Sequence, residues 1–286
     1  MSLCDSVTKS INLYMMTTMN YQDIFGRLWQ DYITQNPATK KVYDLLVREG
    51  ETIVNDHIAF RTYNHPLIGI DVLAKVFIRN GYEYKRDYHF AHKKLYAKHF
   101  EHKTDPEAPR VFISELLVDQ FSEHMKHVVD EWVGNIPVRI LKSKELIYAG
   151  NVSGTPSFKI YEKLRIESEY AAWLYVNGFR VNHFTVSINA LKEYNTVEKV
   201  NTFLKSNGFL LNDANGEIQG TPTDLLEQSS IKAGIIRVPF QEGEFDIPAC
   251  YYEFALRHPE PNGKLYSGFV AKSADKIFES TNYYKR

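Results

Sequence analysis

The sequence contains very little cysteine and no long apolar run. Only Cys4 and Cys250 occur among its 286 residues, too few for a disulfide framework or a cysteine-rich zinc site. Met1–Asn20 has no basic segment followed by an apolar stretch, and no other stretch approaches the length of a membrane span. We therefore expect a protein of the reducing cytoplasm, without a signal peptide and without a membrane partner.

The sequence also lacks a net charge of either sign. Its 34 Lys and Arg residues balance 35 Asp and Glu residues, so it has no long-range attraction to nucleic acid. It contains no glycine-rich phosphate loop, no Gly-x-Ser-x-Gly nucleophile turn and no Cys–His pair. Its hydrophobic fraction of 44% is that of an ordinary globular protein. A small-molecule partner is expected, whereas the oligomeric state is left open.

The first part of the chain combines helical and strand patterns. Apolar residues at helical spacing over 21–50, interrupted by Asn36–Pro37, predict two helices. The residues up to 118 then follow a β, α, β, β, β succession, with a strand at 55–63, a helix at about 66–80, and strands at 83–89, 94–102 and 110–118. Residues 51–118 thus form a first βαβββ module.

The second part of the chain repeats this succession after a helical insert at 119–179. In the first module Gly81 follows His57 by 24 residues (81 − 57), and in residues 180–257 Gly208 follows His183 by 25 (208 − 183). Such internal similarity is typical of a duplicated unit. We predict an α+β fold with two βαβββ modules, extra helices at 21–50 and between the modules, a C-terminal segment at 258–286, and one catalytic domain over 1–286.

Each module places a histidine in its first strand and a glutamate in its last strand. An unpaired charge in an apolar strand is expensive, so these residues are candidates for a metal site. Two imidazoles and one carboxylate leave open positions on Fe(II), Mn(II), Ni(II) or Zn(II). The predicted ligands are His57, His183 and Glu253. Glu115 is either a fourth ligand, a residue that orients a ligand histidine, or the partner of a nearby cation.

Arg61 shares a strand face with His57 and Ala59, because alternate side chains of a strand point the same way. Four residues at about 3.3 Å each place it roughly 13 Å beyond His57. A guanidinium at that distance would grip the far carboxylate of a bound acid through two hydrogen bonds. The alternative is a surface salt bridge.

Several segments carry a resemblance to a known family: Asp56–Thr62, Glu167–Trp173, Gly178–Thr185, Tyr252–Ala255 and Phe278–Thr281. Over about residues 21–283, the chain resembles the 2-oxoadipate dioxygenase/decarboxylase family of the vicinal oxygen chelate superfamily. The resemblance implies a curved mixed sheet around a metal site. It also implies that His57, His183 and Glu253 hold Fe(II), that Arg61 selects the substrate, and that Glu115 is not a ligand.

The resemblance further implies a reaction. A 2-oxo acid and O₂ are the expected substrates, and 2-oxoadipate would lose CO₂ and become hydroxylated to 2-hydroxyglutarate, a step in lysine breakdown. No separate 2-oxoglutarate is needed, because the substrate carries its own oxo acid group. The role of the C-terminal segment is left open. One hypothesis is that Ser267–Tyr283 closes over the pocket, with Gly268 and Ser273 letting backbone amides approach a carboxylate.

Two other functions are compatible with the residues. A glyoxalase-type isomerase or lyase would use Glu115 as a fourth ligand, would hold Zn or Ni, and would consume no O₂. A binding module that sequesters a small molecule between its halves would purify without metal. Oxygen uptake and elemental analysis distinguish these alternatives from the dioxygenase.

Overall fold

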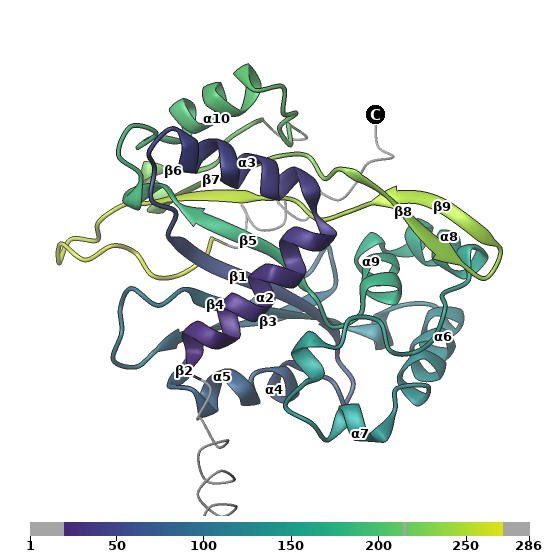
Figure 1. Cartoon of the computed structure of the whole chain (residues 1–286). Coiled ribbons are helices and arrows are strands. Elements are labelled where there is room, and N and C mark those ends of the chain that lie inside the picture. Colours follow the sequence, from purple (N-terminus) through teal and green to yellow (C-terminus); the bar gives the residue numbers. More distant parts are fainter. Residues whose placement is uncertain (1–19, 214–215, 271–286) are drawn as a thin grey trace, which may run out of the picture.

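The centre of the fold is a mixed eight-stranded sheet (Figure 1). The computed structural model describes residues 20–213 and 216–270, so the predictions for Met1–Met19 and for residues 271–286 lie outside the described residues. The strand order is β2-β3-β4-β1-β5-β10-β7-β6. The strands are β1 (Asn55–Tyr63), β2 (Tyr82–Phe90), β3 (Leu95–His102), β4 (Arg110–Leu116), β5 (Val181–Ser187), β6 (Gln219–Thr221), β7 (Leu226–Ser230) and β10 (Glu253–Arg257).

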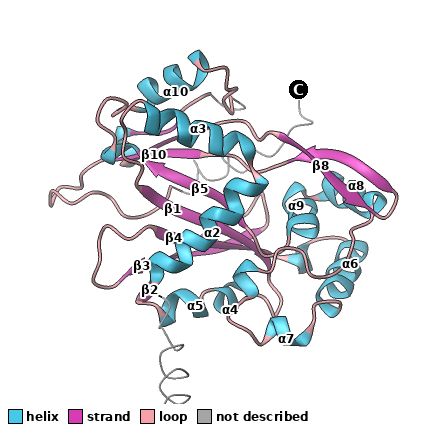
Figure 2. Cartoon of the chain, in the orientation of Figure 1, coloured by secondary structure: helices cyan, strands magenta, loops and turns pink. Residues whose placement is uncertain are grey.

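The sheet is built from two βαβββ modules that meet at its middle. The first module runs from β1 to β4 and the second from β5 to β10, and each carries helices on the outer face (Figure 2). Within each module the first and last strands pair in parallel, whereas β1 and β5 pair antiparallel and join the two modules. The predicted α+β fold with two such modules in one curved mixed sheet is therefore confirmed.

The helix expected at 66–80 is shorter than predicted and broken. Two short helices, α4 (Ile70–Leu73) and α5 (Lys75–Arg79), replace it. Pro66–Gly69 instead forms a turn, in which the Gly69 amide donates to the His65 carbonyl at 2.7 Å. The periodicity of the apolar residues did not distinguish this turn from a first helical turn. The helix of the second module, α10 (Val197–Ser206), begins after Thr196, whose side chain caps the helix by accepting from the Lys199 amide.

The second module also contains a hairpin that the pattern did not separate. The strands β8 (Ile235–Phe240) and β9 (Gly243–Pro248) form a two-stranded sheet between β7 and β10. In Figure 1 this hairpin extends away from the central sheet, beside α8 (Phe158–Glu167). The last strand begins at Glu253, and residues 249–252 before it lie outside the ladder.

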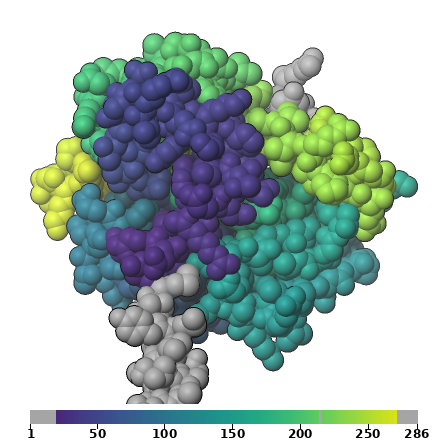
Figure 3. All heavy atoms as spheres, in the orientation of Figure 1, coloured from purple at the N-terminus to yellow at the C-terminus, as the bar shows by residue number. Residues whose placement is uncertain are grey.

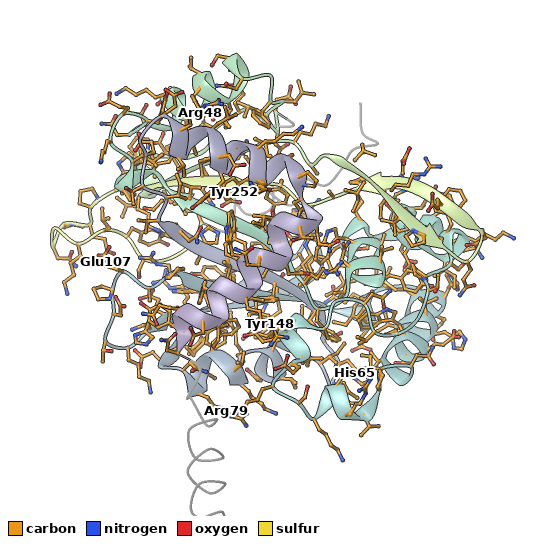
Figure 4. The ribbon with its side chains drawn as sticks, viewed as in Figure 1. Arg48, His65, Arg79, Glu107, Tyr148 and Tyr252 are labelled. Carbon is orange, nitrogen blue, oxygen red and sulfur yellow. The ribbon has the colours of Figure 1, made fainter. Side chains whose placement is uncertain are left out.

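Two N-terminal helices, α2 (Tyr21–Gln35) and α3 (Pro37–Arg48), cover one face of the sheet. Their atoms occupy the middle of the view in Figure 3. Trp29 of α2 contacts the rings of Phe184 and Tyr252, with centroids 5.0 and 5.8 Å apart. Figure 4 shows Tyr252 beneath these helices. His183 and Tyr251, which directly precede Phe184 and Tyr252 in the sequence, line a pocket.

The insert between the modules is helical and packs against β1 and β4. It contains α6 (Glu123–Gly134), α7 (Val138–Leu141), α8 and α9 (Glu169–Asn177). The Tyr170 hydroxyl of α9 lies within hydrogen-bonding distance of the Thr62 amide, at 3.0 Å, and of the Ser114 carbonyl, at 2.7 Å. These contacts fix α9 on β1 and β4. Among the described residues, no helix is both long and apolar enough to cross a membrane.

Candidate metal centre

Three buried side chains from three adjacent strands converge at the middle of the sheet. These are His57, His183 and Glu253, whose candidate ligand atoms all lie within 4.8 Å of one another. Among the described residues, they form the one group of His, Cys, Asp or Glu side chains that could hold a metal ion. His57 Nε2 lies 3.4 Å from Glu253 Oε1, and His183 Nε2 lies 3.6 Å from Glu253 Oε2. The structure thus brings together the three residues that the sequence predicts as ligands.

Strand register explains this convergence. Strand β5 lies between β1 and β10, with His183 opposite Ala59 and Thr185 opposite Glu253. His57 pairs with Thr185 on the other side of β5. Because residues two apart on a strand share a face, the three side chains point into the same concave side of the sheet.

Both histidines are oriented by the residue that precedes them. His57 Nδ1 donates to Asp56 Oδ1 at 2.7 Å, and His183 Nδ1 lies 3.0 Å from Asn182 Oδ1. An acceptor at Nδ1 fixes the tautomer that carries its lone pair on Nε2. Burial lowers the pKa of His57, and burial, together with the nearby positive charge of Arg61, holds the pKa of His183 well below its usual range. Both rings are therefore neutral and can act as ligands.

The Glu253 carboxyl is 1% exposed and incompletely satisfied. Its Oε1 accepts from Gln228 Nε2 at 2.5 Å and from Thr185 Oγ1 at 3.3 Å. Its Oε2 has no hydrogen-bond partner among the described residues. Burial raises the pKa of Glu253 to about 8, although the Gln228 hydrogen bond opposes the shift.

These properties fit a divalent cation. Two neutral imidazole nitrogens and one carboxylate oxygen are suitable ligands for Fe(II), Mn(II), Ni(II) or Zn(II). A cation would also provide the partner that Glu253 Oε2 lacks and would favour its ionised form. A metal site in this fold is therefore consistent with the donor set, and the donor set does not select one metal.

Asp56 belongs to a second buried charge pair. Arg257, the last residue of β10, donates to both of its oxygens, from Nε at 2.6 Å and from Nη2 at 2.9 Å. Burial alone would raise the pKa of Asp56, but the charge and hydrogen bonds of Arg257 outweigh it and hold that pKa well below its usual range. Asp56 is therefore ionised, and its charge faces His57.

Glu115 lies outside the cluster of ligands. In the second module, Glu253 lies opposite Thr185, which is two residues after His183. The corresponding residue of the first module is Phe112, because it lies opposite Ala59, two residues after His57. Glu115 is three positions beyond Phe112, an odd offset that turns its side chain to the other face. There its Oε2 accepts from the Ile70 amide at 3.0 Å, at the start of α4. The structure therefore does not place it as a fourth ligand or beside a ligand histidine.

Arg61 is 2% exposed and lines the same pocket as His57. Its guanidinium lies over the ring of Tyr170, at 4.9 Å, and over the ring of Trp173, at 5.2 Å. Both aromatic residues belong to α9. The expected alternative, a surface salt bridge, does not describe this buried and stacked side chain.

The pocket encloses about 420 Å³ including its mouth, a size typical of small-molecule sites. Besides the three candidate ligands, its lining includes Arg61, Phe112, Ser114, Tyr251 and Phe269. Sequence reasoning did not name Asp56, Arg257 or Phe269 as site residues. The acceptor residue directly before each histidine was a signal that could have identified Asp56. Phe269 lies in the segment Ser267–Tyr283 that was hypothesised to close over the pocket, whereas nothing local identified Arg257.

Comparisons with known proteins agree on one family. The family model described as 2-oxoadipate dioxygenase/decarboxylase matches residues 11–136 and 144–264. A relative from Arabidopsis thaliana, named 2-oxoadipate dioxygenase/decarboxylase, chloroplastic, is 35% identical over 91% of this chain and 77% of its own length.

Solved structures support the same fold. The hydroxyglutarate synthase from Oryza sativa, solved in complex with 2-oxoadipate, is 33% identical and superposes with a TM-score of 0.86 over 92% of each chain. A glyoxalase superfamily protein from Ralstonia eutropha is 21% identical, with a TM-score of 0.69 over 85% of this chain and 83% of its own. The latter likeness concerns the fold alone and agrees with the vicinal oxygen chelate arrangement of paired modules.

Proposed function

This chain belongs to the 2-oxoadipate dioxygenase/decarboxylase family, and from that premise we propose that it is an Fe(II)-dependent enzyme that converts 2-oxoadipate to 2-hydroxyglutarate. The observation that carries the proposal is a single pocket containing a buried His-His-Glu cluster and a buried arginine. The cluster is suited to a metal with open positions. The arginine is suited to the second carboxylate of a diacid.

The proposed reaction balances without another co-substrate. One 2-oxoadipate and one O₂ give one CO₂ and one 2-hydroxyglutarate, so both oxygen atoms of O₂ end in the organic product. Bound Fe(II) would supply the activation of O₂ and the binding of the 2-oxo acid group. His57, His183 and Glu253 would hold it, in keeping with their neutral rings and the unpartnered Glu253 Oε2.

Arg61 would orient the substrate from the far end of the pocket. Its guanidinium is buried and stacked on Tyr170 and Trp173, so its position is restricted before a ligand arrives. A restricted guanidinium loses little conformational entropy when it binds a carboxylate. This arrangement would keep the 2-oxo acid end of the substrate at the ligand cluster.

The walls of the pocket would exclude water from the reacting atoms. Phe112 and Phe269 are each about nine-tenths buried or more, with ring centroids 4.9 Å apart. Phe269 also lies edge-on to His57, with centroids 4.8 Å apart. Apolar walls of this kind protect reactive intermediates from side reactions with water.

The cysteine content suits a reducing compartment, for which we propose the cytoplasm, although the Arabidopsis relative is named chloroplastic.

The test is anaerobic loading with Fe(II), followed by O₂ uptake with a panel of 2-oxo acids of five to seven carbons. We expect uptake with 2-oxoadipate, formation of CO₂ in equal amount, and much weaker uptake with monocarboxylic 2-oxo acids of the same length. Turnover with Zn(II) or Ni(II) and without O₂ uptake would instead identify an isomerase or lyase. A protein that binds 2-oxoadipate equally well with and without metal would be a binding module.

A further inference from the structure

Arg257 joins two parts of the molecule that are remote in sequence. Besides its two hydrogen bonds to Asp56, its Nη1 donates to the carbonyl of Tyr266 at 2.9 Å and to that of Gly268 at 2.7 Å. The side chain is 2% exposed. One guanidinium therefore serves both the residue that orients His57 and the segment Tyr266–Phe269, which we call the strap.

The strap forms one wall of the pocket through Phe269. The ring of Phe269 lies edge-on to His57 and packs against Phe112, with centroids 4.8 and 4.9 Å apart. The guanidinium of Arg257 lies 5.3 Å from the centre of the same ring. Arg257 thus contacts both the backbone of the strap and the side chain by which the strap reaches His57.

A second set of hydrogen bonds holds the other side of the strap. The Phe269 amide donates to the Tyr88 hydroxyl at 3.1 Å, and this hydroxyl lies 2.9 Å from His99 Nδ1. His99 Nε2 lies 2.9 Å from Glu101 Oε1. Since the carboxylate accepts from Nε2, Nδ1 accepts from Tyr88, and every group in the chain has a consistent direction. The strap is therefore held through its carbonyls by Arg257 and through an amide by Tyr88.

We propose that Arg257 is a positioning residue that couples closure of the strap to the presentation of His57 as a metal ligand. Arg257 fixes Asp56, Asp56 fixes the Nδ1–H of His57, and the strap carbonyls complete the hydrogen bonding of the same guanidinium. Displacing the strap would leave Nη1 without these two acceptors and would loosen the pair with Asp56. Losing that pair would equally release the strap.

Coupling of this kind is reciprocal. If the closed strap favours metal binding at the His57 cluster, then bound metal must favour the closed strap to the same extent. The proposal rests on the metal site proposed above, but not on the substrate or on O₂. It can therefore be tested with a redox-stable ion and without turnover.

The first experiment needs no variant. Hydrogen–deuterium exchange of the wild-type protein is followed at the peptide that contains the strap, with and without saturating Mn(II). We expect Mn(II) to slow exchange of the strap amides by about tenfold, a coupling within the usual range. Equal exchange with and without Mn(II), in a protein that binds the ion, would overturn the proposal.

The second experiment compares Arg257→Lys with Arg237→Lys. The lysine at 257 keeps the charge but cannot reach Asp56 and two carbonyls together. Arg237 is a matched control, because it lies on the β8–β9 hairpin and its side chain is 61% exposed. We expect Arg257→Lys to bind Mn(II) about 10- to 100-fold more weakly in an EPR titration, as for other residues that support a metal ligand. Its strap should exchange faster, and Mn(II) should no longer slow it.

The outcomes separate this proposal from the proposed reaction. Unchanged Mn(II) affinity in folded Arg257→Lys, with Arg237→Lys as reference, would overturn the coupling and leave the reaction standing. If Arg257→Lys does not fold, the wild-type exchange experiment decides alone. A wild-type protein that shows the coupling but consumes no O₂ with 2-oxoadipate would overturn the reaction instead. Absence of any metal binding would overturn both.

Discussion

The two modules share a scaffold but contribute differently to the site. Each has a histidine in its first strand whose Nδ1 contacts the residue before it, Asp56 in the first module and Asn182 in the second. The position of Glu253 in the second module is occupied by Phe112 in the first. The two modules therefore present both imidazoles but only one carboxylate, and the first module has the apolar side chain of Phe112 at the position that corresponds to Glu253.

The acceptors beside the histidines differ as well. Asp56 is charged and paired with Arg257 of the second module, whereas Asn182 is neutral and its Nδ2 has no hydrogen-bond partner among the described residues. The first histidine is thus held by an ion pair that spans both modules. The second is held by a local amide. The first module thus contributes Arg61 and Phe112 to the pocket, and the second module contributes two of the three clustered side chains.

The largest expected effect is that of removing the single carboxylate. Glu253→Gln keeps the shape of the side chain and an acceptor for Gln228 but removes the negative ligand. Metal affinity and O₂ uptake should each fall by at least about 100-fold, more than for residues that only support a ligand. Metal content by elemental analysis and oxygen-electrode rates measure both.

Glu115→Gln is the matched control for Glu253→Gln. Glu115 accepts from the Ile70 amide on the other face of the sheet, so its variant should keep the metal and the O₂ uptake of the wild type. Loss of metal in Glu115→Gln, together with retention in Glu253→Gln, would reverse the assignment of the two carboxylates.

The next largest effect concerns Arg61, the proposed substrate anchor in the first module. Arg61→Ala should raise the KM for 2-oxoadipate by about 10- to 100-fold. This increase corresponds to the loss of a charge-assisted hydrogen bond of roughly 1.5–3 kcal/mol. Metal content should not change, because Arg61 is not one of the clustered ligands. Arg61→Lys should recover part of the loss. Loss of iron with unchanged substrate binding would refute the anchoring role.

A substitution at Phe112 tests the difference between the modules directly. Phe112→Glu puts a carboxylate where the second module has Glu253. An additional ligand would fill an open metal position, so O₂ uptake should drop by about tenfold or more while the metal stays bound. Phe112→Leu keeps the apolar wall and should retain most of the activity. Full O₂ uptake in a folded, metal-loaded Phe112→Glu protein would show that this position does not face the metal.

The smallest effect is on the stability of the metal-free protein. Burial raises the pKa of Glu253 from its usual 4.5 to about 8. The protonated carboxyl therefore contributes its full stabilisation below pH 4.5, and this contribution is lost as the pH rises to about 8. The histidines, whose pKa values are lowered, lose their contribution only below about 6.5. Between pH 6.5 and 8 the Tm should therefore fall by about 2–4 °C per pH unit.

Glu253→Gln provides the control for this pH dependence. It has no carboxyl to titrate, so its Tm should not follow the decline of the metal-free wild type between pH 6.5 and 8. Thermal unfolding monitored by circular dichroism, after removal of metal with a chelator, measures both proteins. Parallel slopes in the two proteins would assign the pH dependence to another group.

Much of the fold was predictable because its signals are local or repeated. Strand alternation, the helical spacing of residues 21–48 and the recurring distance from histidine to glycine predicted both modules and the N-terminal helices. The approach of His57, His183 and Glu253 followed from that repeat. Glu115 was wrongly taken as the counterpart of Glu253, because the composition of a strand does not report its register. Glu115 is an odd number of residues from Phe112, the true counterpart, so its side chain lies on the other face.

The remaining features depend on contacts that no local pattern encodes. Arg257 meets Asp56 across 201 positions, and Phe269 reaches His57 from beyond the last strand. Arg61 could be placed on the correct strand face, but its stacking on Tyr170 and Trp173 depends on how the helical insert packs. The cluster of His57, His183 and Glu253 was thus predictable from sequence, whereas the groups that orient and enclose it required the folded chain.

The most direct test of a three-ligand, O₂-using site is isotopic. Fe(II)-loaded protein is mixed with 2-oxoadipate under ¹⁸O₂, and the product is examined by mass spectrometry. We predict 2-hydroxyglutarate that carries label from both atoms of O₂, one in a carboxylate and one in the hydroxyl group, with unlabelled CO₂. A product without label, or 2-oxoadipate consumed without uptake of O₂, would contradict the proposed reaction.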